Sequence, residues 1–187
     1  MDELDSMDAV RFKHRARKAH LVLDPDGFEL FYFTQRTTTW KDWFRDLLKP
    51  IPQKVGNLYD HLDHLVVVVE PGKNDEFDWL EIFDEKRSHI ATVEHHRRHR
   101  EHVFDYKNPK GNLVYKIRDT AYNPYYKIYA PDDETEIGGM DPITMLDPIS
   151  LISRPTQFKF PAGIDLKTKV GLIVTVVYIY QTLKGKK

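Results

Sequence analysis

Residues 170–183 read VGLIVTVVYIYQTL, and this stretch is almost wholly apolar. Fourteen residues exceed the usual length of a strand; as a helix they span about 21 Å, short of the roughly 30 Å of a bilayer core. A helix that is apolar on every side needs partners on every side, which a surrounding β-barrel supplies. Burying about eight large side chains, at roughly 1.5–3 kcal/mol each, outweighs the poor helix propensity of its β-branched residues. The stretch predicts a buried central helix near 167–183.

Upstream of this helix the sequence is organised as hairpins. Runs of β-branched and aromatic residues alternate with turn signals, which are Pro25-Asp26-Gly27, Pro71-Gly72, Asp84-Glu85-Lys86, the NPKG of 108–111 and the PDD of 131–133. Repeated hairpins at this spacing are typical of an antiparallel meander that closes into a sandwich or barrel. The pattern predicts a mainly β fold.

Two segments depart from the hairpin pattern. Large apolar residues recur at helical spacing from Trp40 to Leu48, and two prolines follow, so we expect a short helical insertion near 40–49. Residues 1–18 are acidic and then basic, which predicts a flexible charged segment, with a first strand in the basic run 11–18 as the alternative. We expect one domain over 19–187.

Composition excludes several classes of protein. The 187 residues contain 28 Lys and Arg against 29 Asp and Glu, a balance unlike that of a duplex nucleic-acid-binding protein. With no Cys, the chain has no disulfide, no thiolate metal site and no palmitoylation site. The start MDELDSMD is not a secretory signal, so we expect a cytoplasmic protein, in one alternative peripheral to a membrane.

The carboxyl half resembles the phospholipid-scramblase family at three places in register. These are GNLVYKIR at 111–118, DDETEIG at 132–138, and FKFP at 158–161 followed by IDLKTK at 164–169. The resemblance covers about residues 76–187. It implies the tubby C-terminal-like barrel, about twelve strands around a central helix, which scramblases share with tubby and LURP-one-related proteins. The family motif residues carried over are Phe160, Pro161, Asp165, Lys167 and Lys169.

Two departures from the family argue against calcium-triggered scramblase activity. The aspartate pair of the family's calcium segment is replaced by Ile152-Ser153-Arg154-Pro155, and a hard cation needs six or more oxygen ligands. The cysteine cluster common in animal scramblases is missing as well. We therefore expect no cofactor and no calcium. Lys167 and Lys169 fall at the barrel mouth, where they would solvate the start of the buried helix.

The most unusual local sequence is EHHRRHREH, residues 94–102. Arginine suits phosphate, so one interpretation is an anion-binding platform made of Arg97, Arg98, Arg100, Lys116 and Arg118. A bland interpretation is a charged strand edge or a solvated loop. A metal interpretation would use His95, His99 and Glu101, but i and i+4 imidazoles lie about 13 Å apart on a strand. We assign no metal site.

Catalytic motifs are missing from the sequence, and the His-Asp cluster at 60–64 reads best as an exposed turn. We expect no enzyme. The leading hypothesis is a module that binds anionic phospholipid or phosphoinositide head groups at a membrane surface. One alternative is a cytosolic structural or protein-interaction domain, and another is a membrane scramblase whose terminal helix inserts. Specific partners and the oligomeric state are not encoded in any motif.

Overall fold

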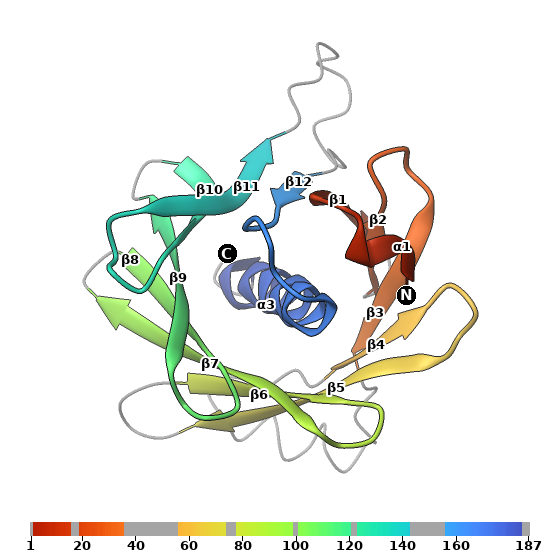
Figure 1. The fold of residues 1–187 in the computed structure, drawn as a ribbon, viewed down its shortest axis with the longest axis horizontal. Helices are drawn as coiled ribbons and strands as arrows, with labels where there is room; N and C mark the ends of the chain where they lie inside the picture. Colours follow the sequence, from red (N-terminus) through yellow and green to blue (C-terminus); the bar gives the residue numbers. More distant parts are fainter. Residues whose placement is uncertain are drawn as a thin grey trace.

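The computed structural model describes residues 2–15, 19–35, 56–73, 78–98, 101–120, 123–142 and 156–184. Within them, twelve antiparallel strands close into one barrel (Figure 1). Each strand pairs with the next along the chain, and β1 pairs with β12 to close the ring. The strands are β1 (Ala9–Arg15), β2 (Ala19–Leu23), β3 (Glu29–Gln35), β4 (Gly56–Asp60), β5 (Leu65–Lys73), β6 (Asp78–Asp84), β7 (His89–Arg98), β8 (Glu101–Lys107), β9 (Leu113–Thr120), β10 (Asn123–Tyr129), β11 (Glu136–Pro142) and β12 (Thr156–Lys159). The predicted mainly β fold and closed barrel are confirmed.

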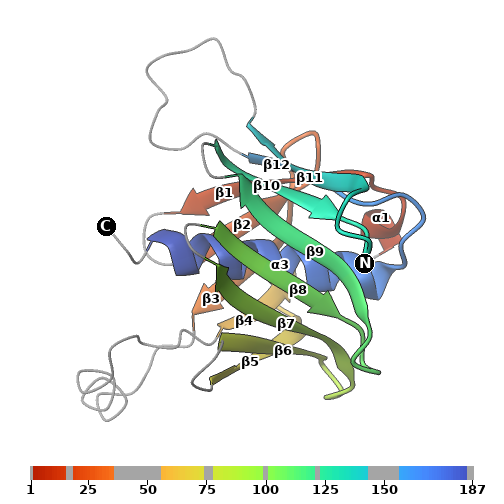
Figure 2. The ribbon, with the colours of Figure 1, turned by 90° about the vertical axis from the view of Figure 1, so that its left-hand side faces the viewer.

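The helix α3 (Leu166–Lys184) runs through the middle of this barrel (Figure 2). From Val170 to Val177 every residue of α3 is buried, and so is Ile179. The polar Thr175 lies within this stretch and donates its hydroxyl hydrogen to the carbonyl of Gly171 at 2.8 Å, so it is satisfied inside the helix. The predicted buried central helix is confirmed, because strands surround it as its apolar residues require.

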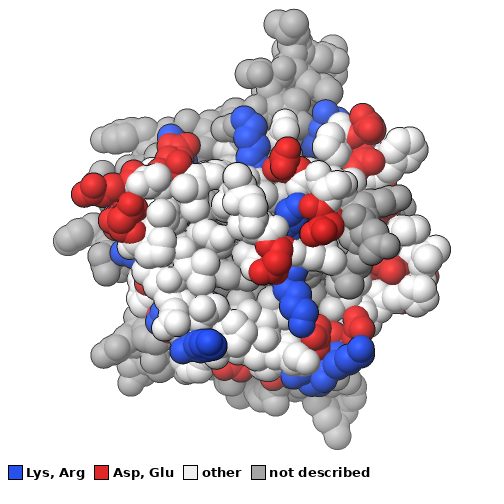
Figure 3. Space-filling model, in the orientation of Figure 1, with Lys and Arg blue, Asp and Glu red and all other residues white. Residues whose placement is uncertain are grey.

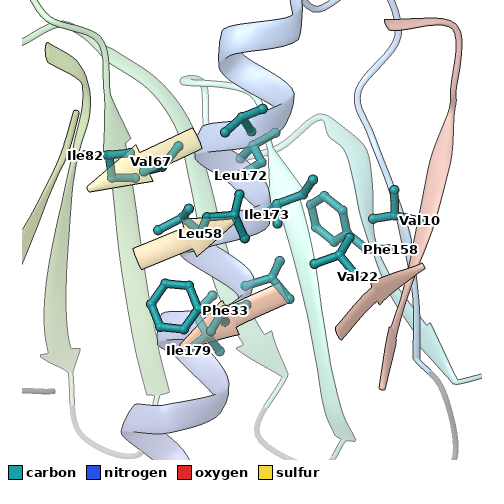
Figure 4. Close-up of a cluster of buried hydrophobic side chains, with 14 of the residues drawn as sticks. Val10, Val22, Phe33, Leu58, Val67, Ile82, Phe158, Leu172, Ile173 and Ile179 are labelled. Carbon is teal, nitrogen blue, oxygen red and sulfur yellow. The ribbon is translucent and has the colours of Figure 1, made fainter. Parts of the chain in front are cut away.

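The core is the contact between α3 and the inward side chains of the strands. Figure 4 shows Leu172, Ile173 and Ile179 of the helix facing inward residues of strands on several sides. In several strands buried and partly exposed residues alternate, as in β6, where Leu80 and Ile82 are buried between less buried neighbours. The inward-facing apolar side chains of the strands therefore pack against a helix that is apolar on every side.

Four of the five described hairpin turns at the end of the barrel that holds the start of α3 share one design; the fifth, between β10 and β11, is built around Asp132. We call this end of the barrel the hairpin end. An Asp or Asn carboxyl or amide oxygen opens each of the four turns and accepts backbone N–H groups two to four residues on, and these residues are Asp24, Asp60, Asp84 and Asn108. Three residues later the backbone has positive φ, at Gly27, Asp63, Arg87 and Gly111. This is the short hairpin loop with a left-handed fourth residue, and it agrees with the turns expected at 25–27, 84–86 and 108–111.

The expected turn at Pro71-Gly72 is wrong. Both residues lie inside β5 and pair with Leu80 and Trp79 of β6. A Cβ atom on Gly72 would stand 2.0 Å from the Trp79 ring. Glycine is required here because the Trp79 indole of the neighbouring strand occupies the space of a side chain. A Pro-Gly pair inside a strand therefore has the same letters as a Pro-Gly turn.

For the segment 1–18, the structure agrees with the alternative of a first strand rather than with a flexible segment. Residues 2–5 form the short helix α1 (Asp2–Asp5), and residues 9–15 form β1, which closes the barrel against β12. Leu4 is 1% exposed and joins the core, because α1 lies over the hairpin end of the barrel. The domain therefore begins before residue 19. The insertion expected near 40–49 lies outside the described residues.

Candidate functional site

Three neighbouring strands bring charged side chains together on the outer surface of the barrel. On β7, β8 and β9 the inward residues Val93, Phe104 and Ile117 are buried. The residues next to each of them along its own strand face outward. The antiparallel register places Glu94 opposite Asp105, and Asp105 opposite Lys116. We call this set the charged strip; it consists of Glu94, His96, Asp105, Lys107, Lys116 and Arg118.

Lys116 and Arg118, two of the predicted anion-binding residues, lie together at Asp133. The Lys116 ammonium is 3.3 Å from Asp133 Oδ2, and an Arg118 Nη is 3.2 Å from Asp133 Oδ1. Arg118 also donates to the Asp133 carbonyl at 2.9 Å and stacks over Tyr129 at 4.3 Å from the ring centroid. Asp133 therefore orients both cations and compensates part of their charge.

Arg97 and Arg98 end β7, at the barrel end opposite the hairpin end. Their backbones pair with His102 and Glu101 of β8, so the run 94–102 is a hairpin and not one strand. Their side chains, and all of Arg100, lie outside the described part of the chain. The five predicted residues thus come from the same three-stranded region, but the structure describes a contact only between Lys116, Arg118 and Asp133.

The histidines of this hairpin divide between the two faces of the sheet. His95 is 6% exposed, stacks on Phe104 at 4.5 Å between ring centroids, and has Nε2 2.8 Å from Nδ1 of His102. His95 therefore faces into the barrel, away from the charged strip. His99 and the side chain of Glu101, the other members of the metal interpretation, lie outside the described residues.

A cluster that the sequence reading missed lies on the outer face. His96 Nε2 is 3.4 Å from Glu94 Oε2 and 3.5 Å from Asp105 Oδ2. The period of two places Glu94 and His96 on one face from sequence alone. Asp105 joins them only through the β7–β8 register, which depends on where the hairpin turns.

The family motif residues have structural roles at the start of α3. Phe160 and Pro161 are buried. Asp165 caps the helix, since its Oδ1 accepts the Thr168 N–H at 2.8 Å. Lys167 is exposed and lies 3.5 Å from Asp84 Oδ2, as expected of a residue that solvates the helix start.

Lys169 corrects the expectation that it also solvates this end. It is 6% exposed, and its ammonium donates to the backbone carbonyls of Leu4, Asp5 and Met7 at 3.1, 2.5 and 2.8 Å. Asp2–Asp5 is a single turn of helix, in which the Leu4 carbonyl already accepts the Met7 N–H at 3.2 Å. The buried ammonium donates to all three carbonyls and ties the amino terminus to the central helix.

The His-Asp cluster at 60–64 is an exposed turn, as expected. Asp60 Oδ1 accepts the backbone N–H groups of Leu62 and His64, both at 2.9 Å. Asp63 accepts the Tyr32 hydroxyl at 2.5 Å, and this hydrogen bond, helped by desolvation, raises the pKa of Tyr32 to about 12. The carboxylates of this cluster are therefore engaged in holding the turn.

Acid should destabilise the barrel through its turn carboxylates. The pKa of Asp84 is lowered, mainly by the Ser88 N–H, and that of Asp132 mainly by the Thr135 N–H. Because each folded pKa lies below the unfolded value of 3.8, the stabilisation is complete above that value and is lost as the pH falls through the folded pKa. We expect the free energy of unfolding, from urea titrations, to fall as the pH drops from about 5 to about 2.

The double variant Asp84→Asn/Asp132→Asn provides the comparison. Asparagine keeps an acceptor oxygen for the turn but does not titrate, so the acid-induced loss should become smaller. Glu85→Gln, which removes a neighbouring charge without touching either hydrogen-bonded carboxylate, should leave the loss unchanged. Equal pH dependence in the wild type and the double variant would contradict the assignment.

The two ends of the barrel differ in charge. The basic residues at the hairpin end are Lys86, Arg87, Lys110, Lys159 and Lys167, with Lys116 and Arg118 paired to Asp133. Acidic residues outnumber them there, and they are Asp24, Asp26, Asp60, Asp63, Asp84, Glu85, Asp132, Asp133, Glu134 and Asp165. Figure 3 views this end and shows acidic groups at several places around its rim and near its centre. At the opposite end the strands terminate, by sequence, in residues of both signs, with Arg15, Lys73, Arg97 and Arg98 beside Asp78 and Glu101. Among the described side chains, the acidic groups gather at the hairpin end.

Comparison with solved structures shows a likeness over the whole domain. The X-ray structure of the Arabidopsis thaliana protein AT5G01750 matches with a TM-score of 0.59, covering 98% of this chain and 96% of that one, at 13% sequence identity. At that identity the likeness shows a shared fold. No protein-family model matches the sequence, and no curated protein matches it. The chain is a closed twelve-stranded antiparallel barrel with a central carboxyl-terminal helix, a fold it shares with this plant protein.

The search for membrane-crossing helices gave one result. Among the described residues, no helix combines the length and the apolar content that crossing a membrane requires.

Proposed function

We propose that this protein is a non-enzymatic module of the tubby and phospholipid-scramblase type that binds anionic phospholipid or phosphoinositide head groups. In this proposal it is a cytoplasmic protein that attaches peripherally to a membrane surface. Support comes from the three sequence motifs, from the shared barrel fold, and from the acidic excess at the hairpin end, which leaves the basic run at 97–100 on the opposite side. It needs no cofactor, no calcium and no nucleic acid.

The membrane-facing end is the one opposite the hairpin end. Arg97 and Arg98 end β7 there, and Arg100 follows in the sequence before β8 begins. Each basic residue close to an anionic bilayer contributes about 1 kcal/mol. Lys116 and Arg118 have a secondary role, because Asp133 already compensates part of their charge.

A surface attachment fits the packing better than insertion of α3. A scramblase that inserts its terminal helix would have to withdraw α3 from the strands around it, and the residues from Val170 to Val177 are buried there. Exposing eight such residues to water on the way costs more than a domain's net stability of about 5–15 kcal/mol. The helix is therefore part of the domain's core in this proposal.

Liposome co-sedimentation tests the proposal. The wild type should bind vesicles that contain phosphatidylserine or a phosphoinositide, and bind pure phosphatidylcholine weakly. The variant Arg97→Glu/Arg98→Glu/Arg100→Glu should lose more than about a hundred-fold in partition coefficient, at about 1 kcal/mol per residue removed.

The matched control changes net charge equally at the other end of the barrel. Lys86, Lys110 and Lys159 are exposed there, and Lys86→Glu/Lys110→Glu/Lys159→Glu should keep most of the binding. An equal loss of vesicle binding in both variants would mean that binding depends on the net charge of the protein and not on one end of the barrel. Wild-type binding that ignores lipid charge would exclude the proposal and favour a cytosolic protein-interaction domain, which would co-purify with protein partners.

A further inference from the structure

Three side chains of the charged strip present metal-ligating atoms to one point. Glu94, His96 and Asp105 each offer one such atom, and all three atoms lie within 4.8 Å of one another. The imidazole nitrogen is 3.4 Å and 3.5 Å from the two carboxylate oxygens. Around a tetrahedral zinc ion with bonds of about 2.0–2.2 Å, neighbouring ligand atoms are separated by about 3.3–3.6 Å. Two edges of the cluster already have that length.

The local electrostatics point to a cation as well. The register places the carboxylates of Glu94 and Asp105 directly opposite each other across β7 and β8, an arrangement that is destabilising unless it is compensated. Lys107 compensates Glu94, with its ammonium 2.6 Å from Oε1, while Lys116, opposite Asp105 on β9, has its ammonium 3.3 Å from Asp133. On the other side, Asp105 Oδ1 is buried and accepts no hydrogen bond from any residue that the structure describes.

The surroundings give the cluster partial shelter from water. The side chains of Glu94, His96 and Asp105 are 18%, 27% and 20% exposed, so competition from solvent is reduced but an ion has access. All three sit on strands of a closed sheet, where the backbone is held by pairing on both sides. A site on paired strands changes shape little when it loads.

We propose that Glu94, His96 and Asp105 bind one divalent transition-metal ion, zinc in the first place, on the outer face of the barrel. One nitrogen and two carboxylate oxygens suit zinc, whereas calcium needs more oxygen ligands than the cluster offers. With three protein donors, the remaining position belongs to water or to an anion. Lys107 holds the other carboxylate oxygen of Glu94, Oε1, so its charge opposes a cation at Oε2, and the ion links β7 to β8. This proposal is independent of lipid binding.

Isothermal titration of the full chain with zinc chloride tests the site. We expect saturable binding of one ion per chain, at least ten-fold weaker in His96→Ala and in Asp105→Asn. His64→Ala is the matched control, because it removes a histidine that pairs with a carboxylate, Asp60, in an exposed turn. The control should bind as the wild type does, and calcium chloride should give no saturable binding.

A variant that binds zinc more tightly than the wild type would distinguish binding at this triad from unspecific binding by the histidines of the chain. Lys107→Gln removes the positive charge that opposes a cation at Glu94, so it should tighten zinc binding and raise the zinc-dependent increase in melting temperature. Unchanged or weaker binding in Lys107→Gln would show that Glu94 does not hold the ion and would overturn the triad. No saturable binding in the wild type, or wild-type affinity in both His96→Ala and Asp105→Asn, would overturn the site.

Discussion

Replacing Ile173 with alanine should lower the free energy of unfolding by about 2–5 kcal/mol, the largest effect we expect from a single truncation in this chain. Ile173 is 0% exposed, in the middle of α3. Strands face α3 from several sides (Figure 4), so the cavity left by three lost carbon atoms cannot collapse by a simple shift of the helix. Alanine is the better helix former by a few tenths of a kcal/mol, which the lost packing outweighs.

Urea denaturation followed by circular dichroism measures this loss. Lys167→Ala, on the exposed side of the first turn of the same helix, should change the free energy by less than about 0.5 kcal/mol. The comparison isolates burial from helix propensity, because both substitutions introduce alanine into α3. A loss at Ile173 as small as that at Lys167 would mean that the helix is not enclosed in solution.

Replacing Lys169 with methionine should cost about 2–4 kcal/mol, although methionine keeps the length of the side chain. The ammonium is the donor to three backbone carbonyls at the end of α1 and in the link to β1. Without it, the three carbonyls lose a charge-assisted donor that an apolar side chain cannot replace, and only the Leu4 carbonyl keeps a backbone partner among the described residues, the Met7 N–H. We expect α1 to detach from the barrel end before the barrel itself unfolds.

Hydrogen exchange resolves the two events. In Lys169→Met the amides of 4–8 should exchange much faster, while those of β6 and β7 keep most of their protection. Lys167→Met places the same side chain two residues away, where the lysine is exposed, and should leave exchange at 4–8 unchanged. If both variants protect 4–8 alike, the three hydrogen bonds do not hold the amino terminus.

Local patterns were sufficient for the larger part of the fold. An apolar stretch too long for a strand and too short for a bilayer indicates a buried helix, and alternating runs with Asp- or Asn-led turns indicate hairpins. Both inferences depend on periodicity, which neighbouring residues alone express. At Pro71-Gly72 the same reasoning failed, because the glycine there accommodates Trp79 from another strand, and that contact has no local signature.

The candidate sites show the same limit more sharply. Glu94 and His96 share a face by sequence, and the basic run beside them is visible in the letters. Asp105 reaches them, and Asp133 reaches Arg118, only through strand pairing. Reading 94–102 as one strand missed the hairpin within it, so cross-strand neighbours were not foreseen.

The sequence alone determines that this protein forms antiparallel hairpins around one apolar helix, because the spacing of its apolar residues determines which surfaces must be buried away from water. Tertiary structure alone decided which charges meet. Lys169 became a buried donor, Asp133 the partner of two cations, and Asp105 the neighbour of Glu94 and His96, since each of these contacts joins separate parts of the chain and depends on register and closure of the barrel.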